Sequence, residues 1–282
     1  MGKASTDRFT GYFYVTPALL VLVIGFFVPV GIMAFASLSP IKPGEWGMFD
    51  NYARFLGQPA LLGALWNSLF IAGIVALASV AVGFPLAAAI VFGVPERHQR
   101  LVLTLLILPF WTSYVVRSYA WLLVLAPNGV VNQALMSVGL ITEPLRLNFS
   151  VAATAIGFVH FFSMLATIII YSGLRQIDKR LLLAAGDLGA GSVRAFVRIV
   201  LPLSAPSIAV AAFLALVMCI GDYITPQILG GNTAPVLPQA IMNQLNRSND
   251  VPMAATLAFV LTTVVLFVVT VCVPVYRARV KS

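Results

Sequence analysis

The polar stretch that decides the organisation of this apolar chain runs Leu181-Leu-Leu-Ala-Ala-Gly-Asp-Leu-Gly-Ala-Gly-Ser-Val-Arg-Ala-Phe-Val-Arg-Ile-Val-Leu-Pro202. It carries Asp187, Arg194 and Arg198 together with three glycines, so it does not suit a membrane interior. The proline that closes it suits the first turn of a new helix. The stretch therefore predicts a loop of two short helices between apolar runs, which presents a docking surface to a soluble partner.

Capping residues and small side chains define the expected form of this loop. The carboxylate of Asp178 is placed to accept hydrogen bonds from the amides that follow it, and Ser192 is placed to cap the second helix. Ala184, Ala185 and Gly189 bring small side chains together, with the last two four residues apart on one helix face. A small face of this kind lets another backbone or a large side chain approach closely.

The composition is that of a membrane protein. Hydrophobic residues make up 60% of the 282 residues and charged residues 9%, and the mean hydropathy is +0.99. A hydrocarbon core about 30 Å thick requires about 20 apolar helical residues. We expect an all-α membrane protein with one domain over residues 1–282 and residues 178–202 as its polar loop. The six expected spans are residues 12–35, 65–92, 101–125, 150–171, 203–224 and 253–275.

Lysine and arginine are divided unequally between the two sides of this arrangement. Twelve of the 17 lie at the N-terminus, in residues 97–100, in residues 175–198 and in the C-terminal tail, whereas four lie in the other connections. Because basic residues concentrate on the cytoplasmic side, both termini and the polar loop are predicted to be cytoplasmic, in a multi-pass protein of the inner (plasma) membrane. The basic residues form no stripe with aromatics, so nucleic acid is not an expected partner.

Ionisable side chains inside the expected spans indicate either structural pairs or a solute path, because each costs at least about 2.5 kcal/mol in the bilayer. Arg117 and Asp222 are expected at similar depth, so they suit an ion pair. Alternatively, Asp222 faces a cavity and helps to pass a cationic solute. His160 suits either a hydrogen bond within the bundle or a position on that path.

Aromatic side chains crowd the third expected span and suit either interface anchoring or cation–π contact with an amine. The residues expected along a solute path are Asp222, Tyr223, Trp111, Tyr114, Arg117 and His160. We predict no catalytic and no metal-binding residue. The chain's Gly2-Lys3 pair is followed by Ala4, whereas a phosphate loop needs Ser or Thr there. ATP hydrolysis, if transport uses it, is therefore expected on another chain.

Six positions have the spacing of the EAA loop of permease subunits in binding-protein-dependent ABC importers: Ala184, Ala185, Gly189, Ile199, Leu201 and Pro202. In that family the loop forms the coupling helix, which inserts into a groove on the ATPase subunit. The resemblance implies a MetI-like permease fold with a cytoplasmic coupling helix. The residues to which it assigns ATPase coupling are Leu183, Ala184, Ala185, Asp187, Gly189, Arg194 and Pro202. Leu183 stands where the family has a glutamate, so the resemblance does not extend to a salt bridge from that position.

Residues 108–121 and 221–232 resemble the spermidine/putrescine branch of these permeases. The resemblance implies an ATP-driven importer subunit that passes a polyamine, or a related amine-containing compound, from a binding protein into the cytoplasm by alternating access. The implied partners are two ATPase subunits, a second and different permease chain, an extracytoplasmic solute-binding protein and membrane lipid. ATP and magnesium would be held by the ATPase subunits, with no cofactor on this chain.

Other functions remain open at this stage. The same class of importer also carries opines, aminophosphonates and other small solutes. An ion-coupled secondary transporter would need no ATPase, but it is expected to show internal repeats and helices broken around an ion site, and no clear repeat is visible. A membrane scaffold or receptor that transports nothing would not need the polar loop.

Overall fold

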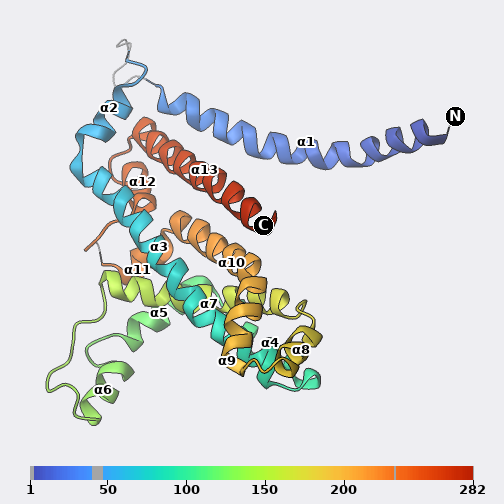
Figure 1. Cartoon of the computed structure of the whole chain (residues 1–282). Helices are drawn as coiled ribbons and strands as arrows, with labels where there is room; N and C mark the ends of the chain where they lie inside the picture. The colour runs from blue at the N-terminus through green and yellow to red at the C-terminus, as the bar shows by residue number, and fades with distance from the viewer. Residues whose placement is uncertain (1–2, 40–46, 232, 282) are drawn as a thin grey trace. The chain divides into compact units, whose positions relative to one another are not determined.

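We analysed a computed structural model of the chain, which describes residues 3–39, 47–231 and 233–281, with side chains described from residue 15 to residue 270. Regular structure in these residues is helical, without a strand (Figure 1). Five helices among them are long and apolar enough to cross a membrane: Val15–Ser37, Pro59–Gly93, Val151–Leu174, Ser192–Gly221 and Val251–Thr270. A sixth span is obtained if the bent pair Glu96–Trp111 and Tyr114–Val124 crosses once. The all-α membrane fold is confirmed.

Contacts divide the chain into two compact units. The first comprises residues 1–62 and 240–264, and the second residues 63–239 and 265–282. The first contains α1 (Lys3–Ser37), α2 (Asp50–Gly57) and part of α13 (Val251–Lys281). In this unit the Asn51 side chain donates hydrogen bonds to the carbonyls of Ser37 and Ser39, 3.1 and 2.9 Å away. Arg54 pairs with Asp250 at 3.1 Å, so α2 ties the end of α1 to the start of α13.

The second unit contains the polar loop and most expected path residues. Its elements are most of α3 (Pro59–Ala88), the π-helical turn η1 (Ala89–Gly93), α4 (Glu96–Ile107), the 3-10 turn η2 (Leu108–Trp111), α5 (Tyr114–Val124), α6 (Val130–Ser137), α7 (Val151–Leu174), α8 (Lys179–Asp187), α9 (Ser192–Ala195), the π-helical turn η3 (Phe196–Val200), α10 (Leu201–Gly221) and α11 (Ile224–Leu229). Helix α12 (Leu237–Asn246) begins in this unit, and its residues from Ala240 onward belong to the first. Helix α7 packs against α10, α11 and α5. It is therefore the central element of this unit.

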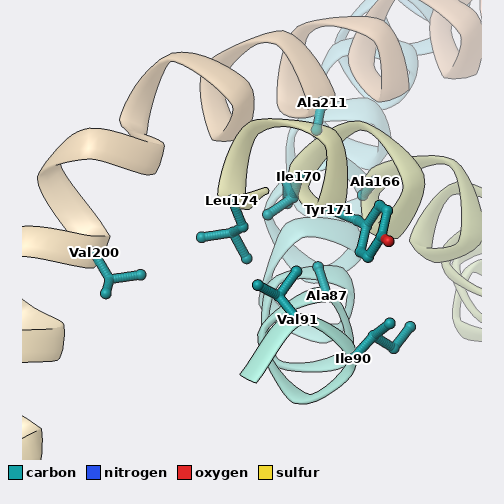
Figure 2. Close-up of a cluster of buried hydrophobic side chains, with 9 residues drawn as sticks. All are labelled: Ala87, Ile90, Val91, Ala166, Ile170, Tyr171, Leu174, Val200 and Ala211. Carbon is teal, nitrogen blue, oxygen red and sulfur yellow. The ribbon is translucent and has the colours of Figure 1, made fainter. Parts of the chain in front are cut away.

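The main apolar cluster of this unit lies where the polar loop joins the long helices. Figure 2 shows side chains of α3, η1 and α7 that point toward one another, with Val200 of η3 at the side. The buried members are Ala87, Ile90, Val91, Ala166, Ile170, Tyr171, Leu174, Val200 and Ala211, and Leu182 of α8 and Phe196 of η3 pack against them. Burial of apolar area stabilises this junction by about 25 cal/mol per Å².

Two of the expected spans differ from the structure in a way that matters for function. The third is not one helix, because α4 and α5 meet at an angle of 90°. Pro109 lacks an amide and favours a break there. The fifth ends at Gly221 rather than at residue 224, so Asp222 lies in extended backbone between α10 and α11. Both differences place a helix break beside a polar side chain.

Pro202 lies in the first turn of α10, as its position in the sequence predicts, but α10 is continuous with the helical turns before it. Residues Ser192–Gly221 run as one helical span, in which the π turn of η3 precedes α10. Because Pro202 has no amide, the carbonyl four residues earlier lacks its α-helical partner. A π turn, with hydrogen bonds between residues five apart, accommodates this defect without ending the helix.

Candidate functional site

Helix α8 is closed at both ends by hydrogen bonds that its own sequence provides. The Asp178 carboxylate accepts from the amide of Arg180 at 2.9 Å, so the predicted cap is confirmed. At the other end, the amides of Gly189 and Ala190 donate to the carbonyls of Gly186 and Ala185, both at 2.9 Å. These two bonds form a Schellman motif. Gly189 has φ +77°, a left-handed conformation that glycine adopts without strain.

The predicted cap at Ser192 is wrong. The N-cap of α9 is Gly191, and no side chain bonds to it, while Ser192 is the first helical residue. Glycine is tolerated at this position almost as well as serine, so the local chain can begin its helix one residue earlier. The second helical piece itself is present.

Six of the seven residues assigned to coupling are exposed, and two further exposed apolar residues, Leu188 and Val193, lie among them. Leu183 is 69%, Leu188 89% and Val193 79% exposed, which is unusual for large apolar side chains in a polar loop. Ala184, Asp187 and Arg194 are also exposed, and Pro202 is too, whereas Ala185 is partly buried. An open groove of about 660 Å³ lies beside them, lined by Gly189, Gly191, Ser192, Val193, Arg194, Val197 and Arg198. This surface has the apolar and basic character of a protein docking site.

One ion pair connects α8 to α4. Lys179, the first residue of α8, donates a hydrogen bond to Glu96, the first residue of α4. This bond and the charge of Lys179 hold the pKa of the Glu96 carboxyl below its ordinary value of 4.5. Both side chains are largely exposed, so the pair is screened by solvent.

The two helix breaks meet at Tyr114 and Asp222. The Tyr114 hydroxyl donates to the Asp222 carboxylate and accepts a bond of 2.7 Å from the hydroxyl of Thr225. The second carboxylate oxygen of Asp222 accepts from the amide of Ile224, the first residue of α11, at 2.8 Å. One carboxylate therefore joins α5, α10 and α11.

Arg117 and His160 lie beside this contact. The Arg117 guanidinium stacks 4.4 Å from the ring centre of Phe161 and 5.4 Å from that of Tyr114, and the ring of His160 lies 5.4 Å from that of Trp121. Arg117 forms no ion pair with Asp222 in the described part of the chain. Its Nη1 and the Nδ1 of His160 are buried without a hydrogen-bond partner among those residues. The predicted Arg117–Asp222 pair is therefore absent from this conformation.

The remaining expected path residues lie outside this cluster of polar contacts. Trp111 is 86% exposed and forms no aromatic contact among the described side chains. Tyr223 is partly exposed and is the N-cap residue of α11. Sequence reasoning missed Thr225 and Phe161, which complete the surroundings of Tyr114 and Arg117. Phe161 follows His160 directly, and Thr225 lies three residues after Asp222 in the stretch already singled out.

Comparison with known proteins identifies the class. Residues 79–279 match the model of the family described as binding-protein-dependent transport system inner membrane component. The chain belongs to this family and is a multi-pass, inner-membrane permease component of an ABC importer.

Individual relatives agree with that assignment. The chain is 30% identical over 268 residues, 95% of its length and 89% of the relative's, to the spermidine/putrescine transport system permease protein PotB of Haemophilus influenzae. It is 34% identical over 215 residues, 76% of its length and 74% of the relative's, to PotB of Salmonella typhimurium. A solved bacterial ABC transporter involved in alginate import has the same fold, with a TM-score of 0.82, 20% identity and 98% coverage of both chains. The predicted permease fold is confirmed.

Proposed function

We propose that the chain is the permease subunit through which a polyamine, or a related amine-containing solute, enters the cytoplasm. The observation that carries this proposal is the Asp222 carboxylate, which lies at the meeting of two broken helices and binds only Tyr114 and a backbone amide among the described residues. A carboxylate at a helix break, near a tyrosine ring, suits an ammonium group. The similarity to PotB proteins supports the same class of solute.

The exposed loop around α8 supports coupling to a separate ATPase. The chain would contribute Leu183, Ala184 and Asp187 to the contact, and two ATPase subunits would hold ATP and magnesium. A second permease chain and an extracytoplasmic binding protein complete the proposed assembly. The excess of basic residues in and around the loop supports a cytoplasmic location for the loop and both termini.

In this proposal the residues act by position and charge, without covalent chemistry. ATP binding closes the ATPase dimer and moves α8, and the two helix breaks then separate or approach. Tyr114 and Asp222 part when an ammonium group replaces the tyrosine hydroxyl at the carboxylate. Hydrolysis resets the breaks. Family membership argues against the ion-coupled secondary transporter and against a scaffold that transports nothing.

A second solute class is favoured by Arg117. Its Nη1, which has no hydrogen-bond partner among the described residues, lies close to Tyr114, and Asp222 bonds the same tyrosine. A solute with both an amine and an anionic group, such as an opine or an aminophosphonate, would satisfy both charges. A polyamine satisfies Asp222 alone.

The test is isolation of the chain from mild-detergent extracts, followed by uptake assays with the recovered complex. We expect an ATPase subunit and a second permease chain to co-purify, and proteoliposomes loaded with ATP to take up labelled spermidine or putrescine when the binding protein is present. Uptake of an opine or aminophosphonate instead would select the second solute class. Repeated purification of the chain without any other subunit would contradict the proposed assembly.

A further inference from the structure

The buried amide of Gln99 bonds three helices at the junction next to the polar loop. Its side chain is 4% exposed. The amide nitrogen donates to the carbonyl oxygens of Val91 and Val94, at 3.2 and 2.9 Å. The amide oxygen accepts from the hydroxyl of Tyr171 at 3.0 Å. One residue of α4 thus links two other parts of the fold. These are the turn η1, which ends α3, and the C-terminal end of α7.

These bonds satisfy groups that have no other ready partner. The last four carbonyls of a helix lack intrahelical donors, and Val91 and Val94 lie where η1 ends and the backbone becomes extended. Both hydrogens of the Gln99 amide are used, and so is its oxygen. Loss of this side chain would leave two carbonyls and a buried tyrosine hydroxyl unpaired, at a penalty that is larger in an apolar surrounding than in water.

The same junction receives the polar loop on its other side. Leu182 of α8 and Phe196 of η3 pack on the apolar cluster that contains Val91 and Tyr171, as Figure 2 shows for its buried members. The ring of Phe196 lies 5.7 Å from that of Phe84 on α3. Two π-helical turns, η1 and η3, also meet this cluster. Single π turns inside helices frequently mark functional sites, so the junction is a suitable place for movement.

Helix α4 leads from this junction to the Tyr114–Asp222 contact. It has 12 residues, which span about 18 Å at 1.5 Å per residue. At its far end η2 follows, and then the bend of 90° into α5, whose first residue is Tyr114. A displacement of the start of α4 would therefore also move Tyr114, which bonds Asp222 at the other helix break.

We propose that Gln99 is a positioning residue that couples the two regions. Its bonds fix α4 to the ends of α3 and α7, against which α8 packs. When α8 moves, α4 therefore moves with this junction and displaces Tyr114 relative to Asp222. Lys179 and Glu96 form an exposed and weaker link along the same route, whereas the Gln99 bonds to Val91 and Tyr171 are buried. The inference rests on the proposed function for the partner that moves α8, but not on the identity of the solute.

The test compares Gln99→Leu with Gln176→Leu in the complete transporter. Gln176 lies near the same end of α7, but it is exposed, and among the described residues its side chain bonds only to the Ser172 carbonyl. It therefore serves as a control for the loss of a glutamine side chain. Reconstituted in liposomes with the ATPase subunits and binding protein, Gln99→Leu is expected to keep ATP hydrolysis within about two-fold and to lose about ten-fold in solute moved per ATP. Tyr171→Phe, which keeps both donor bonds of Gln99, should show a smaller loss of the same kind.

A second measurement does not depend on the solute. Spin labels at Thr112 and Arg180, introduced after replacement of Cys219 and Cys272, report the distance between the helix break and α8 by pulsed electron resonance. We expect ATP to change this distance in the wild type and in Gln176→Leu, and not in Gln99→Leu. An unchanged response and transport ratio in Gln99→Leu would overturn the inference, as would a proportional loss of hydrolysis and transport. If the labels respond as expected but no polyamine is carried, the proposed solute is wrong and the inference stands.

Discussion

The polar loop and the helix breaks are both polar interruptions of an apolar chain, but they differ in what their side chains contact. In the loop, Leu183, Leu188 and Val193 are exposed, and hydrogen bonds formed within the loop close both ends of α8. At the breaks, Asp222 and Tyr114 bond each other, and Arg117 is 9% exposed against an aromatic ring.

In the proposed function, this difference distinguishes a surface that binds another protein from a site that rearranges during transport. The loop closes both ends of α8 by itself and leaves large apolar side chains uncovered, which in a soluble segment indicates an interface. The breaks are internally bonded, so a solute at Asp222 must displace the Tyr114 hydroxyl. A substitution at the loop should therefore affect assembly first, whereas a substitution at the breaks should affect transport first.

The largest effect is expected from Ala184→Trp. Ala184 is exposed in α8, so the new side chain leaves the fold unchanged but occupies the space that a docked partner would fill. Overpacking of a close contact costs about 1–3 kcal/mol, and ATP-dependent uptake should fall by up to about a hundred-fold. Uptake and co-purification of the ATPase measure the effect. Gly189→Trp is less suitable, because a side chain at φ +77° adds strain of about 1–2 kcal/mol.

The matched control for this variant is Leu140→Trp, since Leu140 is 70% exposed in the connection after α6. It should reach the membrane and support uptake as the wild type does. Wild-type uptake with ATPase still bound in Ala184→Trp would show that the small face of α8 is not the docking surface.

A smaller effect is expected from Asp222→Asn. The asparagine oxygen still accepts from the Ile224 amide at the start of α11, but the negative charge is lost. Bonds to a charged group contribute about 1.5–3 kcal/mol, so uptake should fall about ten-fold while the protein level in the membrane is unchanged. Initial uptake rates and membrane levels measure this prediction.

Asp250→Asn is the matched control, because Asp250 also accepts from the amide of the helix that follows, at 3.0 Å from Met253, and has one further polar partner, Arg54. Its loss should leave the uptake rate nearly unchanged. An equal decrease in both variants, or none in Asp222→Asn, would assign Asp222 a purely structural role.

The smallest effect is expected from Lys179→Gln. Both side chains of the Lys179–Glu96 pair are exposed, and such pairs contribute little, so uptake should change by less than about two-fold. The hydrogen bond and the charge of Lys179 lower the pKa of Glu96 below its ordinary value of 4.5, so this carboxyl loses the bond only at a pH below that value. The pH profile of uptake between pH 5 and 8 should therefore match the wild type. A large loss would make this pair, rather than Gln99, the main link between α8 and α4.

Local sequence signals were sufficient for α8 and for the number of apolar runs. The Asp178 cap depends on residues two apart and the Gly189 turn on one glycine, so neighbours in sequence settle both. The six expected apolar runs each contribute to a candidate span, because membrane thickness sets helix length independently of packing. The Ser192 cap failed, since glycine at residue 191 starts the helix equally well.

Contacts between distant residues could not be predicted in the same way. Tyr114 and Asp222 are 108 positions apart, and Gln99 and Tyr171 are 72 apart. The expected Arg117–Asp222 pair came from equal depth alone, and the structure instead directs Arg117 to Phe161. Depth along a helix follows from counting residues, but the direction of a side chain around the helix axis depends on which helices pack beside it.

The amino-acid sequence by itself thus determined the membrane fold, the helical ends of the polar loop and the family resemblance, because each depends on composition or on residues close in the chain. The tertiary structure decided that two helix breaks meet at one carboxylate and that a buried glutamine joins α3, α4 and α7. The physical reason is that a buried polar group must find a partner, and several partners of the right chemistry are available until packing brings one of them within hydrogen-bond distance.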